Sequence, residues 1–291
     1  MNRTSKKTLI PVALCYDFDG TLAPGNMQER SFLPDLGMTA EEFWTACENH
    51  AKEHDMDAIL GYMFLMLREA GIRKKPINRK AFSNHGKSIK FFPGVKNWFS
   101  RIDEYGISLG LDVQHFLISS GIREMVEGSS IAKHFRYIFA SSFQYDENGV
   151  AIWPALAVNY TNKTQYLFRI NKGILNAWDN SKINKYTPDE ERAIPFENFI
   201  YIGDGETDVP AMKLLRFQGG TAIGVFPPDD KSLSKKIQKA MRENTLDLIR
   251  RERADYVTVA DYRSGKPLDQ IVKNRMQVIA SSEACDRLSS N

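Results

Sequence analysis

The chain has 291 residues, 42% of them hydrophobic, which is enough to bury a sizeable core in one or two domains. Its 39 Lys and Arg residues nearly balance 36 Asp and Glu residues, and no basic run is interleaved with aromatics, so no nucleic-acid partner is expected. No stretch is long and apolar enough to span a membrane, and the three scattered cysteines favour a reducing compartment. We therefore expect a cytoplasmic protein without a membrane partner; the oligomeric state stays open.

The first predicted element is a buried strand at residues 12–16, which runs directly into Asp17 and Asp19. Residues i and i+2 of an extended segment point the same way, so both carboxylates are expected in one pocket at the strand's carboxyl end. Such a pair repels unless a cation separates it, and Mg2+ prefers oxygen ligands. A plain polar turn is the alternative. The basic residues 1–7 resemble the start of a signal peptide, but the core strand that follows argues against cleavage, and we predict a mobile tail there.

A helical segment is predicted for residues 26–90, which are too many for a simple connection. Thr39 and Glu42 form a capping box, a second helix carries apolar residues from 59 to 67 and ends before Gly71, and a short third helix is expected over 79–89. We predict an inserted α-helical cap at 26–90, with the catalytic core formed by 8–25 and 91–280.

Beyond this segment, a helix is expected from Pro93 to about residue 105, followed by an apolar strand at 115–118 that ends in Ser119. Ser120 and Gly121 follow it, and a helix is expected over 122–127. A strand at 136–145 and a hairpin turn lead into an extended segment at 150–153.

A second acidic cluster follows another predicted buried strand at residues 199–202. Asp204 stands at the strand's end, and Asp208 lies four residues later at a helix start, where it could also serve as a cap. Further strands are predicted at 221–225 and 256–259, helices at 232–243 and 268–279, and a mobile tail at 281–291. Alternating strands and helices indicate an α/β fold, a Rossmann-like doubly wound parallel sheet with helices on both faces.

The Asp-Phe-Asp-Gly-Thr run at 17–21 and the Gly-Asp-Gly-x-Thr-Asp run at 203–208 resemble the first and fourth motifs of the haloacid dehalogenase-like phosphatases. The resemblance covers roughly residues 10–230. It implies that Ser119 is the second-motif residue, with Thr21, Ser120 and Gly121 near the phosphate.

The third motif of this family is a Lys, and two candidates lie in the right interval. Lys163 follows a short predicted strand at 157–160, and Lys172 precedes a glycine as in phosphoserine phosphatase relatives. We favour Lys163, because a strand-to-helix junction lies at the carboxyl edge of the sheet.

The resemblance also implies roles for the acidic residues. Asp17 would be the nucleophile that forms an aspartyl-phosphate, and Asp19 would protonate the leaving alcohol. The Asp17 carboxylate, the main-chain carbonyl of Asp19 and Asp204 would hold Mg2+, with Asp208 in direct or indirect contact with it. Because a halide leaves without a proton, the presence of Asp19 favours a phosphatase over a dehalogenase.

We therefore expect a Mg2+-dependent phosphomonoester hydrolase of the phosphoserine phosphatase-like subgroup, acting on a small phosphorylated metabolite. Relatives that cleave phosphoserine carry a substrate-contacting Glu about nine residues past the nucleophile. Here residues 23–27 read Ala-Pro-Gly-Asn-Met and Glu29 is displaced, so a nucleoside monophosphate or a sugar phosphate fits equally well. A phosphotransferase or mutase using the same intermediate, and a non-catalytic binding protein, are the alternatives.

Overall fold

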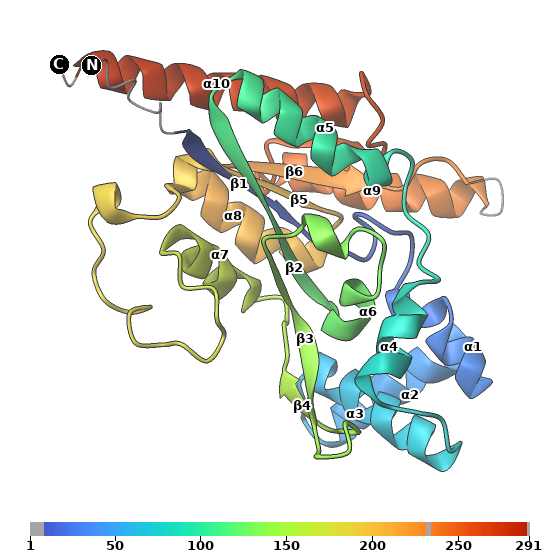
Figure 1. The fold of residues 1–291 in the computed structure, drawn as a ribbon. Helices are drawn as coiled ribbons and strands as arrows, with labels where there is room; N and C mark the ends of the chain where they lie inside the picture. The colour runs from blue at the N-terminus through green and yellow to red at the C-terminus, as the bar shows by residue number, and fades with distance from the viewer. Residues whose placement is uncertain (1–8, 231–233, 290–291) are drawn as a thin grey trace.

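The computed structural model describes residues 9–230 and 234–289, and its centre is a seven-stranded sheet in the order β4-β3-β2-β1-β5-β6-β7 (Figure 1). All neighbouring strands are parallel except the antiparallel pair β3 and β4. The strands are β1 (Ile10–Tyr16), β2 (Leu111–Ile122), β3 (Tyr137–Tyr145), β4 (Ala151–Leu156), β5 (Phe199–Gly203), β6 (Thr221–Phe226) and β7 (Tyr256–Val259).

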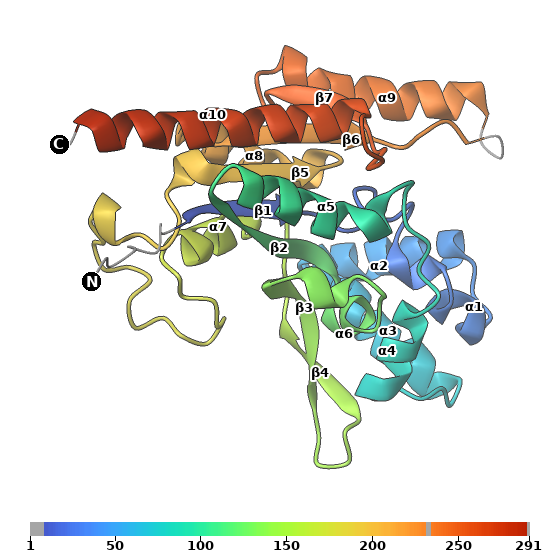
Figure 2. The same cartoon turned by 45° about the horizontal axis from the view of Figure 1, so that its top comes forward.

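Helices cover both faces of this sheet (Figure 2). They are α1 (Phe32–Leu36), α2 (Ala40–Glu53), α3 (Ala58–Ile72), α4 (Arg79–Gly86), α5 (Val95–Ser108), α6 (Arg123–Glu127), α7 (Lys163–Asn171), α8 (Val209–Phe217), α9 (Lys235–Arg250) and α10 (Pro267–Ser289). None of the described helices combines the length and the apolar character that a membrane span requires.

The central strand β1 shows why the sheet needs two helical layers. Its side chains alternate, so Leu14 and Tyr16 join the hydrophobic cluster that contains α5 and α10 residues, while Ala13 and Cys15 join the cluster of α7 and α8. All four are completely buried. A strand buried on both faces is typical of a doubly wound sheet, and the predicted α/β class is confirmed.

The order of the strands places two predicted motifs next to each other. From β1 the chain fills one side of the sheet with β2 and β3, and later fills the other side with β5 and β6. The topological switch therefore lies between β1 and β5, where open α/β sheets bind their ligands. Asp17 follows β1 and Asp204 follows β5 at this same edge.

The segment at 26–90 contains the helices α1 to α4, which lie together at one end of the sheet (Figure 1). Its capping box forms as predicted, since the Thr39 hydroxyl accepts from the Glu42 amide. The segment also contacts the core closely. A Cβ on Gly86 of α4 would lie 1.9 Å from the Met125 carbonyl oxygen, and one on Gly128 would lie 1.9 Å from that of Ser83.

Several predicted boundaries were wrong. Residues 157–160 form no strand, because the chain leaves the sheet after β4. Ser120 and Gly121 lie within the irregular strand β2, which ends at Ile122, and the helix expected over 122–127 begins at Arg123. Helix α3 continues past Gly71 to Ile72, α4 stops at Gly86, and α9 extends to Arg250. Residues 281–289 belong to α10 and are not the predicted tail, whereas residues 1–7, 232–233 and 290–291 lie outside the described part.

Candidate active site

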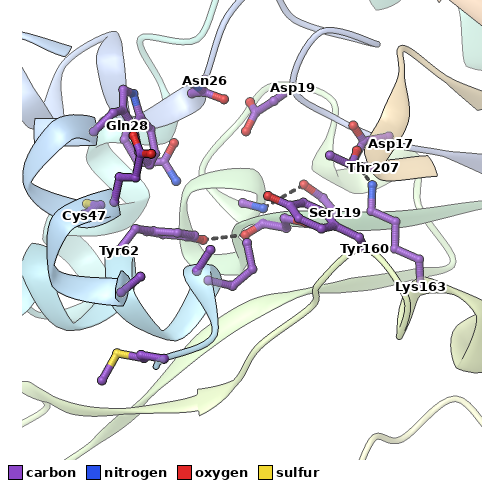
Figure 3. Close-up of a pocket in the computed structure, with 18 of the residues that line it drawn as sticks. Asp17, Asp19, Asn26, Gln28, Cys47, Tyr62, Ser119, Tyr160, Lys163 and Thr207 are labelled. Carbon is purple, nitrogen blue, oxygen red and sulfur yellow. Dashed lines mark hydrogen bonds and ion pairs between the residues drawn. The ribbon is translucent and has the colours of Figure 1, made fainter. Parts of the chain in front are cut away.

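A cavity of about 630 Å³ lies between the carboxyl edge of the sheet and the helical segment (Figure 3). Gln28, Cys47 and Tyr62 lie on its helical side, and Asp17 and Lys163 lie on the opposite side. The predicted site residues that line it are Asp17, Asp19, Ser119, Ser120, Gly121, Lys163 and Asp204. Residues from β1, β2, α7 and the turn after β5 thus meet at one place.

Asp17 and Lys163 form a buried ion pair, with Lys163 Nζ donating to Asp17 Oδ1 at 2.9 Å. Burial raises the pKa of Asp17 to about 6. The positive charge of Lys163 opposes this rise, and the negative charge of Asp208 adds to it. Burial disfavours the ammonium of Lys163, but the carboxylates of Asp17 and Asp208 raise the pKa of Lys163 above its ordinary value. Lys163 is therefore held as a cation beside Asp17.

Asp208 lies behind this pair, and both of its carboxylate oxygens accept hydrogen bonds from the protein. Oδ1 accepts from Lys163 Nζ at 2.7 Å and from the Tyr201 hydroxyl at 2.7 Å, and Oδ2 accepts from the Asp204 amide at 3.1 Å. Asp208 is completely buried and does not line the cavity. Its geometry suits the orientation of Lys163 and of the turn that carries Asp204.

Asp204 lies against the loop that follows β1. A Cβ on Gly20 would lie 2.1 Å from Asp204 Oδ2, and Gly20 has a φ of +75°, so only glycine allows this approach. Burial and the charges of Asp17 and Asp208 raise the pKa of Asp204 well above its ordinary value. A bound cation would offset both the cost of burying the Asp204 carboxylate and its repulsion by Asp17 and Asp208.

Asp19 is held in place by the short turn that follows it. Its Oδ1 accepts a hydrogen bond from the Met27 amide at 2.9 Å, at the start of the 3-10 turn Met27–Glu29. Burial and the charge of Asp17 raise the pKa of Asp19 well above its ordinary value. This environment favours a protonated carboxyl group, which can donate a proton.

The end of β2 brings Ser119 to the cavity. Its Oγ accepts from the Gly121 amide at 3.0 Å, and a Cβ on Gly121 would lie 2.2 Å from Met27 Cε. The Ser120 hydroxyl is buried and has no hydrogen-bond partner among the described residues, while its carbonyl accepts from Tyr62 of α3.

Two predicted site residues lie away from the cavity. Thr21 is completely buried, does not line the cavity, and its carbonyl accepts from the Tyr262 hydroxyl at 2.8 Å. Lys172 lies at the end of α7, where its Nζ donates to the carbonyls of Ile183 at 2.8 Å and Lys185 at 2.5 Å. Lys172 thus fastens a surface loop, and Lys163 is the lysine that reaches Asp17.

Several residues of the site were not predicted from the sequence. Tyr201 lies in the apolar run of β5, and Tyr62 lies in a helix whose apolar pattern indicated only core packing. Gln28, Trp44 and Tyr160 also line the cavity. No local motif marks any of them, because their roles depend on which segments face one another across the cavity.

The carboxylates suit a divalent metal ion. Oxygens of Asp17, Asp204 and Asp208 lie within 4.8 Å of one another, and this oxygen-only set fits Mg2+ better than softer metals. Because both Asp208 oxygens are already hydrogen-bonded, Asp17 and Asp204 are the better direct ligands.

The chain was compared with known proteins. No model of a known protein family matches it. An uncharacterized protein of Borreliella burgdorferi is 32% identical over 229 residues, a match that covers 70% of this chain and 78% of the relative. The chain is therefore in one family with that protein.

Among solved structures, a HAD family hydrolase from Salmonella enterica serovar Typhi has a TM-score of 0.51 and 18% identity, with 79% of this chain and 66% of that chain covered. A phospho-aspartyl intermediate analogue of phosphoserine phosphatase has a TM-score of 0.52 and 16% identity, covering 91% and 99%. At such identities these likenesses concern the fold alone, and this chain shares the fold of these two structures.

Proposed function

We propose that this protein is a Mg2+-dependent phosphomonoester hydrolase that works through an aspartyl-phosphate on Asp17. The observation that carries the proposal is the position of Asp17, which directly follows the central strand, lines the cavity and pairs with buried Lys163. One of the structures with the same fold is described as a phospho-aspartyl intermediate analogue, which supports the same chemistry here.

In the first step, a carboxylate oxygen of Asp17 attacks the phosphorus atom and the bond to the leaving alcohol oxygen breaks. Asp19 gives its proton to that oxygen, as its raised pKa allows. Lys163 and the Ser119 hydroxyl hold the phosphoryl oxygens. Each such interaction is typically worth about 3 kcal/mol in the transition state.

In the second step, a water attacks the phosphorus atom of the acyl phosphate and gives a proton to Asp19. The bond between phosphorus and the Asp17 oxygen breaks, which releases phosphate and restores both carboxyl groups. Mg2+, held by Asp17 and Asp204, would supply positive charge that offsets the repulsion between the carboxylate and the phosphate dianion. Asp208 orients Lys163 through the 2.7 Å hydrogen bond.

The helical segment at 26–90 completes the proposal as a cap. It supplies the wall of the cavity opposite Asp17, including Gln28, Trp44 and Tyr62, and so decides which leaving groups fit. The core formed by 8–25 and 91–280 would supply the chemistry.

The test is the Asp17→Asn variant, which keeps an acceptor for Lys163 but cannot form the acyl phosphate. We expect phosphate release from phenyl phosphate to fall by about a thousandfold or more while the circular dichroism spectrum is retained. Asp189→Asn, at an exposed residue outside the cavity, is the matched control. Substantial turnover by Asp17→Asn would refute the proposal.

A further inference from the structure

The side chain of Gln28 is the most informative group on the cap side of the cavity. Gln28 is 2% exposed and lines the cavity, yet its Oε1 has no hydrogen-bond partner among the described residues. A buried amide without a partner costs free energy, so it indicates a group that arrives with the ligand.

Apart from Asn26, the buried and half-buried residues around Gln28 on the cap side are apolar or aromatic. On the cap side they include Trp44, Cys47, Ala51, Met56, Ile59 and Tyr62. Tyr160 stands on the core side, about half exposed, and its ring packs against no other described aromatic ring. A flat ring could stack on the free face of Tyr160, as bases do on aromatic side chains.

The cap side offers little to an amino-acid zwitterion. The described lining contains no arginine that could pair with a carboxylate. Glu29 does not line the cavity, because its carboxylate accepts from Asn26 Nδ2 at 2.7 Å and from Trp44 Nε1 at 2.8 Å. Lys52, at the exposed rim, pairs with Glu48 at 2.6 Å. The other charged residues of the cap side, Glu48 and Asp55, are also exposed, so phosphoserine would find charged partners for its amino-acid end only at the rim of the cavity.

The size of the cavity favours a larger leaving group as well. Its volume of about 630 Å³ equals that of about 20 water molecules in the liquid, far more than phosphoserine needs. The phosphate end and the Gln28 end belong to opposite walls (Figure 3). A ligand that uses both must carry a phosphate at one end and a hydrogen-bonding ring at the other.

We propose that the cap side binds a heterocyclic base and that the substrate is a nucleoside monophosphate. The Gln28 amide would pair with a donor and an acceptor on the edge of the base, since a Gln side chain offers both kinds of group. The sugar would span the middle of the cavity and place the phosphate at Asp17. This inference rests on the phosphatase function proposed above.

The experiment compares kcat/KM with Mg2+ for adenosine 5′-monophosphate, ribose 5-phosphate, phosphoserine and phenyl phosphate. We expect the nucleotide to exceed ribose 5-phosphate and phosphoserine at least tenfold. Gln28→Met should lower the ratio of nucleotide to phenyl phosphate turnover about tenfold. Its thermal midpoint should not fall, because an unpaired buried amide is removed. Gln144→Met, at an exposed position on β3, should leave the ratio unchanged.

Tyr160→Leu provides a second variant at a half-exposed position, so its effect does not depend on core packing, and it too should lower this ratio. Equal or faster turnover of phosphoserine or ribose 5-phosphate would overturn the inference and leave the phosphatase function standing. An equal loss on nucleotide and phenyl phosphate in both variants would also overturn it.

If the protein hydrolyses none of the four phosphate esters, the phosphatase function proposed above is wrong. In that case calorimetry with adenosine, which has no phosphate, tests the base site by itself. Binding that weakens at least tenfold in Gln28→Met would support the site, and no binding to the wild-type chain would overturn it.

Discussion

Tyr201 and Asp208 form a buried hydrogen bond of 2.7 Å that lies directly behind the candidate nucleophile. Asp208 Oδ1 also accepts from Lys163, which in turn donates to Asp17 at 2.9 Å. The three contacts form a chain from the interior of the sheet to the cavity. The position of the ammonium group beside Asp17 therefore depends on a tyrosine that touches no part of the cavity.

Tyr201→Phe tests this positioning role. The change removes one hydrogen bond to a carboxylate, and we expect the free energy of unfolding to fall by about 1–3 kcal/mol. Turnover of phenyl phosphate should fall mainly in kcat, because Lys163 loses a fixed orientation and keeps its charge. Tyr256→Phe, at a partly exposed tyrosine, is the control in urea unfolding and kinetics. Unchanged kcat in Tyr201→Phe would show that Lys163 needs no such support.

Lys163→Met and Lys172→Met separate the two lysines. Lys163→Met leaves the buried carboxylates of Asp17 and Asp208 without their cation, so we expect a loss of about 3–5 kcal/mol in metal-free stability. Its kcat should fall at least about a hundredfold. Lys172→Met removes only two hydrogen bonds to a surface loop and should retain kcat. A large loss of kcat in Lys172→Met, with kcat retained in Lys163→Met, would show that Lys172 is the third-motif lysine.

Metal binding should stabilise the folded chain, since Asp17 and Asp204 stand together only in the native state. At a Mg2+ concentration 100 times the dissociation constant, mass action raises the free energy of unfolding by about 2.7 kcal/mol. The thermal midpoint should therefore rise when Mg2+ is titrated into chelator-treated protein. The rise should be much smaller in Asp204→Asn, whereas Asp112→Asn, at an exposed residue outside the cavity, should behave as wild type. An equal rise of the thermal midpoint in the wild type, Asp204→Asn and Asp112→Asn would show that the ion binds elsewhere.

Gly86→Ala tests how the cap is attached to the core. The connection between the cap and the core at residues 92–94 is closely packed, since the Pro93 carbonyl accepts from the Tyr262 amide at 2.8 Å and a Cβ on Gly94 would lie 2.4 Å from the Arg263 amide nitrogen. At Gly86 the added methyl group would meet the Met125 carbonyl, so we expect a loss of about 1–3 kcal/mol in urea unfolding.

The matched control is Gly71→Ala in α3, where a Cβ meets nothing within 4 Å. This change should be neutral or stabilise the protein by up to about 1 kcal/mol, because alanine favours the helix. If Gly86→Ala is also neutral, α4 moves freely against α6, and the cap opens at this contact.

The sequence by itself determined the α/β class and the place of Asp17, Asp19, Ser119 and Asp204 at strand ends. These features depend on local patterns, since an apolar run followed by carboxylates and glycine specifies a strand and the turn after it. Parallel strands then present their carboxyl ends at one edge, which is why residues so far apart in sequence could be predicted to meet.

Only the tertiary structure showed that Lys163, and not Lys172, lies beside Asp17, because the strand expected at 157–160 does not exist and the two lysines stand at opposite ends of the same short helix. It also showed that Thr21 does not line the cavity and that Gln28, Tyr62 and Tyr160 do. The physical reason is that side chains from separate segments form the cap wall of the cavity. Which of them point into the cavity depends on how α2 and α3 pack against the core. A side chain's burial at such a contact follows from its partners in space, and no local pattern in the sequence carries that information.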